Sequence, residues 1–261
     1  MNSSVTDVST RQIEIINKLQ DCGSVSVKDL ARDFAVSEMT IRRDLARLQN
    51  RGLLQRTHGG GAPAGKLKFL QNALLHYTAS VTKSAIGELA ASLVSPGETI
   101  MVDSGSTTLE VARHLPKSLG LTIATTSLCV AQELYGSPIQ VMVLGGILRS
   151  DFPGLIGPIT DSILSNLHVN TLFIGCDGAD SQNGFYMSDL NASGQERAMI
   201  RVADRVILVT ESTKFKRCTF ARFAAPYEID TIITDPGISQ TDKANLEEAG
   251  VKVLIANTTQ S

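Results

Sequence analysis

Apolar residues recur with two different periods along the chain, and the change of period divides it into two parts. In residues 11–51 they recur every three or four positions, which is the spacing of amphipathic helices. After residue 81, short apolar runs alternate with helical patterns, which is typical of strands buried in a parallel sheet between helices. The pattern therefore predicts a small helical unit followed by a larger α/β unit.

The first part predicts three helices. The first spans 11–21 and the second 27–34, and a tight turn at Ala35-Val36 separates the second from a third that opens at Ser37. The Ser37 hydroxyl is placed to accept hydrogen bonds from the free N–H groups at the start of this third helix. Its buried stripe is Ile41, Leu45 and Leu48, which leaves its arginines mostly on the outer side.

A short glycine-rich ribbon follows the third helix. Gly52 is expected to end that helix, and LLQRT with the glycines after it predicts a small wing that carries Arg56 and His58. A tight turn between the second and third helices, a basic outer side on the third helix and a wing after it are typical of a winged helix-turn-helix. This module places a helix in the DNA major groove. The residues expected to meet DNA are Ser37, Thr40, Arg42, Arg43, Arg47, Arg56 and His58.

We expect a domain boundary after the wing. The stretch 59–63 (GGGAP) is expected to break regular structure, and 64–81 reads as a connector with a short helix at 67–77. The predicted domains are a DNA-binding domain at 1–61, a linker at 62–81 and an effector domain at 82–261.

The second part predicts seven strands and six helices in alternation. Such a sheet is mainly parallel and covered on both faces, so the fold class is α/β. The strands are expected at 99–103, 121–125, 139–144, 171–177, 205–210, 231–235 and 251–256, and the helices at 82–94, 107–115, 128–135, 161–167, 192–203 and 240–249.

Small, hydroxyl-bearing or charged residues follow five consecutive predicted strands. In parallel sheets ligands bind at the carboxyl ends of the strands. Glycine, hydroxyl groups and a helix N-terminus together suit a phosphate, so the Asp103–Thr108 loop (DSGSTT) is the best phosphate candidate. The residues predicted at an anionic, hydroxyl-rich ligand are Lys83, Asp103, Ser104, Gly105, Ser106, Thr107, Thr108, Thr126, Ser127, Gly146, Asp177, Gly178, Glu211 and Lys214. Each loop by itself could equally be an ordinary helix cap, and the arginines of the head a solvated helix face.

Charge and composition refine the picture. The 261 residues carry a net charge of −2, yet residues 9–58 hold nine Lys/Arg against six Asp/Glu, whereas residues 59–261 hold fifteen against nineteen. A basic head on an acidic body predicts that only the head meets phosphates of DNA. The four scattered cysteines fit neither disulfides nor a zinc site, and neither a signal peptide nor a transmembrane run is visible. We therefore expect a cytoplasmic protein without metal, cofactor or membrane partner.

Both parts resemble one family. The head resembles the DeoR family of bacterial transcription regulators in VSEMTIRRDL (36–45) and in Arg56-Thr-His58-Gly-Gly60. The body is similar to the effector domain of that family at Lys83, DSGSTT, Thr126-Ser127, Gly145-Gly146, residues 173–178, Lys214-Phe215 and Thr234-Asp235. The resemblance implies a repressor of a sugar-catabolism operon that binds operator DNA as a homodimer or homotetramer and is relieved by a phosphorylated sugar.

The body is also similar to ribose 5-phosphate isomerase, through Ser104–Thr107 and Asp177–Asp180. The lysine, Gly-rich run and Arg-Glu-Lys that supply the base of that enzyme do not follow here, and proton abstraction needs a positioned base. A sensor is therefore favoured, and a phosphosugar isomerase-like enzyme with a regulatory DNA-binding head stays as the alternative. A DNA-binding scaffold with a vestigial ligand site is a third reading.

Three positions depart from the DeoR pattern. Glu211 stands where an Asp is usual, His76 where the connector usually has Arg, and Ala192 or Gly194 where an acid is frequent. These departures bear on which sugar is bound more than on the class of ligand.

Overall fold

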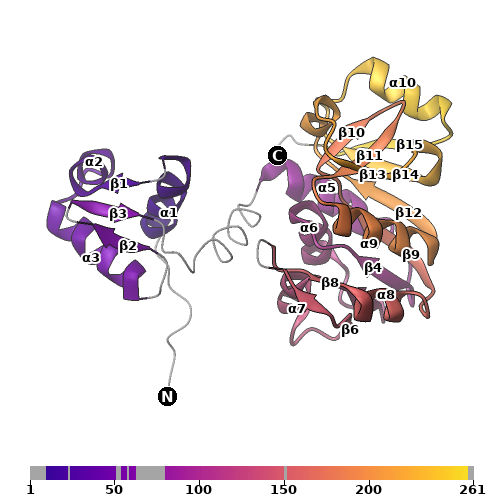
Figure 1. The fold of residues 1–261 in the computed structure, drawn as a ribbon, viewed down its shortest axis with the longest axis horizontal. Helices are drawn as coiled ribbons and strands as arrows, with labels where there is room; N and C mark the ends of the chain where they lie inside the picture. The colour runs from indigo at the N-terminus through magenta and orange to yellow at the C-terminus, as the bar shows by residue number, and fades with distance from the viewer. Residues whose placement is uncertain are drawn as a thin grey trace. The chain divides into compact units, whose positions relative to one another are not determined.

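A computed structural model describes residues 10–22, 24–50, 54–57, 59–62, 80–149 and 152–257. These residues form two compact units (Figure 1). The head comprises the elements from α1 to β3, and the body comprises those from α5 to β15. The expected helix at 67–77, Gly52 and His58 lie outside the described residues.

Three helices build the head, as the apolar pattern predicts. They are α1 (Thr10–Cys22), α2 (Val27–Asp33) and α3 (Glu38–Asn50). Their apolar faces meet in one core that includes Leu19, Leu30 and Ile41. The tight turn between α2 and α3 is made by Ala35, whose φ of 52° places it in the left-handed region.

A three-stranded sheet completes the head and corrects one expectation. The strands β1 (Val25–Ser26), β2 (Gln55–Thr57) and β3 (Gly60–Ala62) pair in the order β1-β3-β2. The glycine run was expected to break regular structure, but Gly60 and Gly61 lie in β3, its central strand. A Cβ atom on Gly60 would lie 1.7 Å from the Val25 carbonyl oxygen, so close strand approach requires glycine here.

A seven-stranded sheet forms the centre of the body, and every neighbouring pair in it is parallel. All seven predicted strands are confirmed as members of this sheet, in the order β15-β14-β12-β9-β4-β5-β6. Their bounds are β4 (Thr99–Val102), β5 (Thr122–Thr125), β6 (Gln140–Val143), β9 (Val169–Ile174), β12 (Ala203–Val209), β14 (Thr231–Thr234) and β15 (Lys252–Ile255).

Helices cover both faces of the sheet, and the six predicted ones are confirmed. Because crossovers between parallel strands are right-handed, α6 and α7 lie on one face and α8 and α9 on the other, with α5 packed on α6. Their bounds are α5 (Val81–Ala91), α6 (Ser106–His114), α7 (Leu128–Leu134), α8 (Pro158–Leu164), α9 (Leu190–Arg201) and α10 (Gln240–Glu248).

The pattern does not predict the short elements of the body. The strands β10 (Gly178–Asp180), β11 (Gly184–Met187) and β13 (Ala221–Ala224) form a small antiparallel sheet, and β7 (Ile147–Leu148) pairs with β8 (Leu155–Ile156). Two 3₁₀ turns, η1 (Ser212–Lys216) and η2 (Pro226–Glu228), follow β12 and β13. Elements of two to five residues are too short to show a period.

Candidate functional site

The exposed side of α3 carries the cationic residues that were predicted to meet DNA. Arg42, Arg43 and Arg47 are all exposed, and Arg42 lies 3.2 Å from Glu38 one turn earlier. Ser37 caps the helix: its Oγ accepts the Thr40 N–H at 3.2 Å and lies 2.9 Å from Thr40 Oγ1. Helix α3 therefore presents three guanidinium groups and a polar N-terminus on one side.

The wing strand β2 is exposed along its length, and Arg56 lies on it. An exposed cationic ribbon beside a basic helix can contact a DNA backbone. The structure brings Arg56 into the same head as α3, whereas His58 lies outside the described residues.

Asp44 fixes the position of α3, and the sequence analysis did not single it out. This carboxylate is buried, and it accepts a hydrogen bond from Arg11 Nε at 2.7 Å and from Gln12 Nε2 at 2.9 Å. These two hydrogen bonds tie α3 to α1. They therefore keep Arg43 and Arg47, which flank Asp44 in the sequence, on the outer side of the helix.

In the body sheet, the strand order reverses between the neighbouring strands β4 and β9, which makes this a topological switch point. These strands are neighbours, but the chain runs from β4 to β5 on one side and from β9 to β12 on the other. Ligands of open α/β sheets bind at such a switch point, outside the carboxyl ends of the strands. The loops after β4 and β9 carry Asp103–Thr108 and Asp177–Gly178, so the strongest predicted residues lie at this point.

Asp103 joins the ends of these two strands. It is buried, and its carboxylate accepts hydrogen bonds from the Ser104 N–H and, at 3.1 Å, from the Gly175 N–H. Burial raises the pKa of Asp103, and the hydrogen bonds offset only part of that shift. Asp103 therefore fixes the start of the loop after β4 and links it to the end of β9.

The loop after β4 opens α6 with its polar groups toward the strand end. Gly105 is the N-cap, and Ser106 and Thr107 lie half-buried in the first turn. The first N–H groups of a helix have no partner within it, so this turn favours an anion. Thr108 is buried and has a structural role, because its Oγ1 accepts the Gly105 N–H at 2.8 Å and donates to Asp103 O at 2.7 Å.

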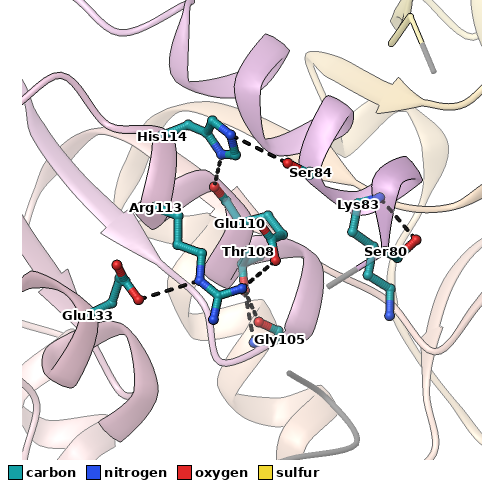
Figure 2. A network of polar contacts seen from close by, with 9 residues as sticks. All are labelled: Ser80, Lys83, Ser84, Gly105, Thr108, Glu110, Arg113, His114 and Glu133. Atoms are coloured by element: carbon teal, nitrogen blue, oxygen red, sulfur yellow. Dashed lines mark hydrogen bonds and ion pairs between the residues drawn. The ribbon is translucent and has the colours of Figure 1, made fainter. Parts of the chain in front are cut away.

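Polar contacts with the neighbouring helices α5 and α7 hold α6 in place (Figure 2). His114 Nδ1 lies 2.8 Å from the Glu110 carbonyl oxygen, and its Nε2 lies 3.5 Å from Ser84 Oγ on α5. Arg113 pairs with Glu110 and reaches Glu133 on α7. A rigid α6 keeps its N-terminus at the switch point.

Four of the other predicted residues lie at this edge of the sheet, three of them with clear structural roles. Ser127 caps α7 by accepting the Val130 N–H at 3.2 Å. A Cβ atom on Gly146 would lie 2.2 Å from Thr160 Oγ1, and one on Gly178 would lie 2.2 Å from the Arg217 carbonyl oxygen. Thr126 differs, because its Oγ1 is buried and has no hydrogen-bond partner among the described residues.

Charged side chains gather at the ends of β9 and β12. Lys83, in the first turn of α5, lies 3.7 Å from Glu211, and Lys214 lies half-buried in η1. Asp177 accepts the Ser188 N–H at 2.9 Å. The lysines can attract an anion, while the carboxylates can accept hydrogen bonds from hydroxyl groups.

Glu196 on α9 is the functional candidate that the sequence analysis missed. Its side chain is buried and interacts electrostatically with Asp103, Asp177 and Arg149. Burial, followed by the Asp103 charge, raises the pKa of Glu196 well above its ordinary value. Helical spacing would have placed this position on the buried side of α9. A glutamate at a buried position was the signal in the sequence that could have identified it.

This buried carboxyl makes the stability of the body depend on pH. Above about pH 4.5, the ordinary pKa of glutamate, the unfolded chain releases a proton that the fold retains, so the folded state loses stability as pH rises. Glu196→Gln removes this titration. We expect the variant to gain stability relative to the native protein as pH rises from 5 towards the raised pKa of Glu196, by up to about 1.4 kcal/mol per pH unit. Urea unfolding of the body across that range measures it, and parallel pH profiles would contradict it.

The described residues show neither a metal-binding cluster nor a membrane-spanning helix. No group of His, Cys, Asp and Glu in them could hold a metal ion. None of the helices within the described ranges is long and apolar enough to cross a membrane.

A DNA-binding head and an α/β body with polar loops at its switch point define a class: transcription regulators with a separate sensor domain. Residues 11–63 match the DeoR-like helix-turn-helix domain, and residues 78–236 match the DeoR C terminal sensor domain. The chain belongs to the DeoR family of transcription regulators.

Several relatives are similar to this chain over nearly its whole length. The HTH-type transcriptional regulator GlpR of Haloferax volcanii is 32% identical over 94% of this chain and 96% of its own length. The transcriptional repressor AccR of Agrobacterium fabrum is 30% identical (95% and 97%), and the L-fucose operon activator of Haemophilus influenzae is 30% identical (92% and 97%).

The similar solved structures include two with low sequence identity. Ribose 5-phosphate isomerase A of Methanocaldococcus jannaschii has 17% identity and a TM-score of 0.38 over 51% of this chain and 52% of its own. The sorbitol operon regulator SorC of Klebsiella pneumoniae has 16% identity and a TM-score of 0.37 over 92% of this chain and 100% of its own. Likeness at this level says nothing about function.

Proposed function

We propose that this protein is a repressor of a sugar-catabolism operon, released from its operator by a phosphorylated sugar bound at the carboxyl edge of the body sheet. The observation that carries the proposal is the position of the N-terminus of α6. This helix end is formed by the loop Asp103–Thr108 and lies at the switch point between β4 and β9. Regulators of this kind act where the DNA is, so we place it in the cytoplasm.

For the head, we propose that α3 enters the major groove. Arg42 and Arg43 then reach guanine edges or phosphates, with Ser37, Thr40 and Arg47 beside them. Arg56 and His58 of the wing hold the neighbouring backbone or minor groove.

For the body, we propose that the phosphate lies on Ser104–Thr107 and the sugar extends toward Asp177. Lys83 and Lys214 supply positive charge, and Thr126 Oγ1 offers a buried hydroxyl group that has no partner among the described residues. Thr108, Ser127, Gly146 and Gly178 shape the site rather than contact the ligand. Glu211, which pairs with Lys83, limits how far that lysine reaches.

We propose that the protein works as a homodimer or homotetramer, because a single head buries little DNA surface. Several large apolar side chains of the body support self-association, since they are exposed around β7 and α8. They include Ile147, Leu148 and Ile159, which are 63%, 48% and 62% exposed.

The isomerase alternative needs a carboxylate free to accept a proton. The sequence analysis found no such base after Asp177–Asp180, and the structure corrects the picture by bringing Glu196 beside Asp103 from α9. Burial raises the pKa of Glu196, so at a given pH a smaller fraction of it is ionised and able to accept a proton than of an ordinary glutamate. We therefore propose a sensor without turnover.

A ligand panel with operator binding tests this proposal. We expect at least one of ribose 5-phosphate, fructose 6-phosphate and glucose 6-phosphate to raise the melting temperature of the protein, because a ligand of the native state stabilises it by mass action. The same compound should weaken operator binding and remain chemically unchanged after incubation. Isomerised product would favour the enzyme, and stabilisation without operator release would contradict the regulatory role.

A further inference from the structure

Glu196 has a carboxyl oxygen that finds no hydrogen-bond partner in the part of the chain that the structure describes. The side chain is 3% exposed, and Oε2 has no hydrogen-bond partner among the described residues. A buried polar atom without a partner destabilises a fold, so its presence calls for a functional reason.

The surroundings of Glu196 place this oxygen at the switch point. It interacts electrostatically with Asp103, which directly follows β4, and with Asp177, which follows β9. The nearby cation is Arg149, whose Nη1 lies 3.2 Å from Asp189, the N-cap of α9. Glu196 is therefore one of three carboxyl groups around the end of the proposed phosphate loop.

The chemistry of this group decides what it can bind. A second anionic group on a ligand would be repelled by Asp103 and Asp177, and the described residues hold no cluster suited to a metal ion. A hydroxyl group is neutral and can both donate and accept a hydrogen bond, so it suits an unpartnered carboxyl oxygen beside a carboxylate. A polyhydroxy ligand supplies such a group.

We propose that Glu196 is a sugar-binding residue, which hydrogen-bonds a hydroxyl group of the effector through Oε2 while the phosphate lies on Ser104–Thr107. This inference rests on the proposed function and adds to it: the end of the ligand away from the phosphate bears hydroxyl groups and no carboxylate. Binding brings to Oε2 the partner that the fold lacks.

Calorimetric titration of the full chain tests the inference with ribose 5-phosphate, fructose 6-phosphate, glucose 6-phosphate and inorganic phosphate as probes. A site built to hydrogen-bond a hydroxyl group loses affinity when that bond is removed. We expect Glu196→Met to weaken sugar-phosphate binding about tenfold or more and to leave inorganic phosphate unchanged. Glu196→Gln keeps a polar group of the same shape, and we expect its sugar-phosphate affinity to stay within about threefold of the native value.

Gln195→Met is the matched control. Gln195 is the adjacent residue of α9, is 5% exposed and also has an unpartnered oxygen among the described residues, but it lines a cavity with Ile156 and Leu190. We expect this variant to bind every probe like the native protein. If Glu196→Met does not fold, Glu196→Asp takes its place, because it withdraws the carboxyl by one methylene and should lose affinity in the same way.

The outcomes separate the two proposals. Native sugar-phosphate affinity in Glu196→Met, or an equal loss in Gln195→Met, would overturn the role of Glu196 and leave the proposed function standing. Failure of the native protein to bind any of the four probes would overturn both.

Discussion

We expect the double variant Arg42→Ala, Arg43→Ala to lose operator binding while its affinity for sugar phosphates stays native. Both side chains are exposed on α3, and among the described residues Arg42 alone of the two forms an ion pair, an exposed i,i+4 contact with Glu38 that adds little stability. Each guanidinium contact with a base or phosphate contributes about 1–3 kcal/mol, so operator affinity should fall about 30-fold or more. Fluorescence anisotropy with an operator duplex, selected by the native protein from a random library, measures the change.

The salt dependence and a charge-matched control sharpen this experiment. If both arginines contact phosphates, the slope of log K against log salt should become shallower by about 2. Lys243→Ala, Lys252→Ala removes the same charge from α10 and β15 of the body, and we expect native operator binding from it. Native operator affinity in the arginine variant would show that α3 is not the recognition helix.

We expect Thr107→Glu to have the opposite effect, with operator binding retained and the response to sugar phosphates lost. Thr107 lies in the first turn of α6, where a phosphate would meet free N–H groups. A glutamate there repels the phosphate and fills its place, yet an acidic residue favours a helix N-terminus, so the fold should persist. Loss of charge-assisted hydrogen bonds should weaken sugar-phosphate and inorganic phosphate binding about 30-fold or more.

Thr107→Ser is the control for this variant, because it keeps the hydroxyl group and removes one methyl group. We expect nearly native binding from it in the same titrations. An unchanged effector response in Thr107→Glu would remove the loop after β4 from the effector site.

The sequence predicts the large elements of this fold well, because each is long enough to show its period. Every strand of the parallel sheet and every α-helix among the described residues was predicted with bounds close to those observed. Strand β3 was not, since its glycines are typical of a loop. Gly60 lies in a strand because the Val25 backbone leaves no room for a side chain, which is a tertiary contact that local pattern does not report.

For the candidate site, the sequence predicts which loops meet but not what each residue does there. The carboxyl ends of parallel strands lie at one edge of the sheet. Asp103 and Asp177 could therefore be placed at the same edge, because each stands at the end of a predicted strand. The division between residues that shape the loops, such as Thr108 and Ser127, and residues open to a ligand depends on hydrogen bonds that only the structure gives. Glu196 was missed because it lies within helix α9 and not in a loop that directly follows a strand of the sheet.

Operator binding as a function of sugar-phosphate concentration, measured side by side for the native protein and Thr107→Glu, tests the central claim most directly. The ligand is the compound from the panel that most raises the melting temperature of the native protein. We expect saturating ligand to weaken operator binding by the native protein about fivefold or more, within the usual range of allosteric coupling, and to leave Thr107→Glu unaffected. Equal operator affinity of the native protein with and without saturating ligand would contradict the account.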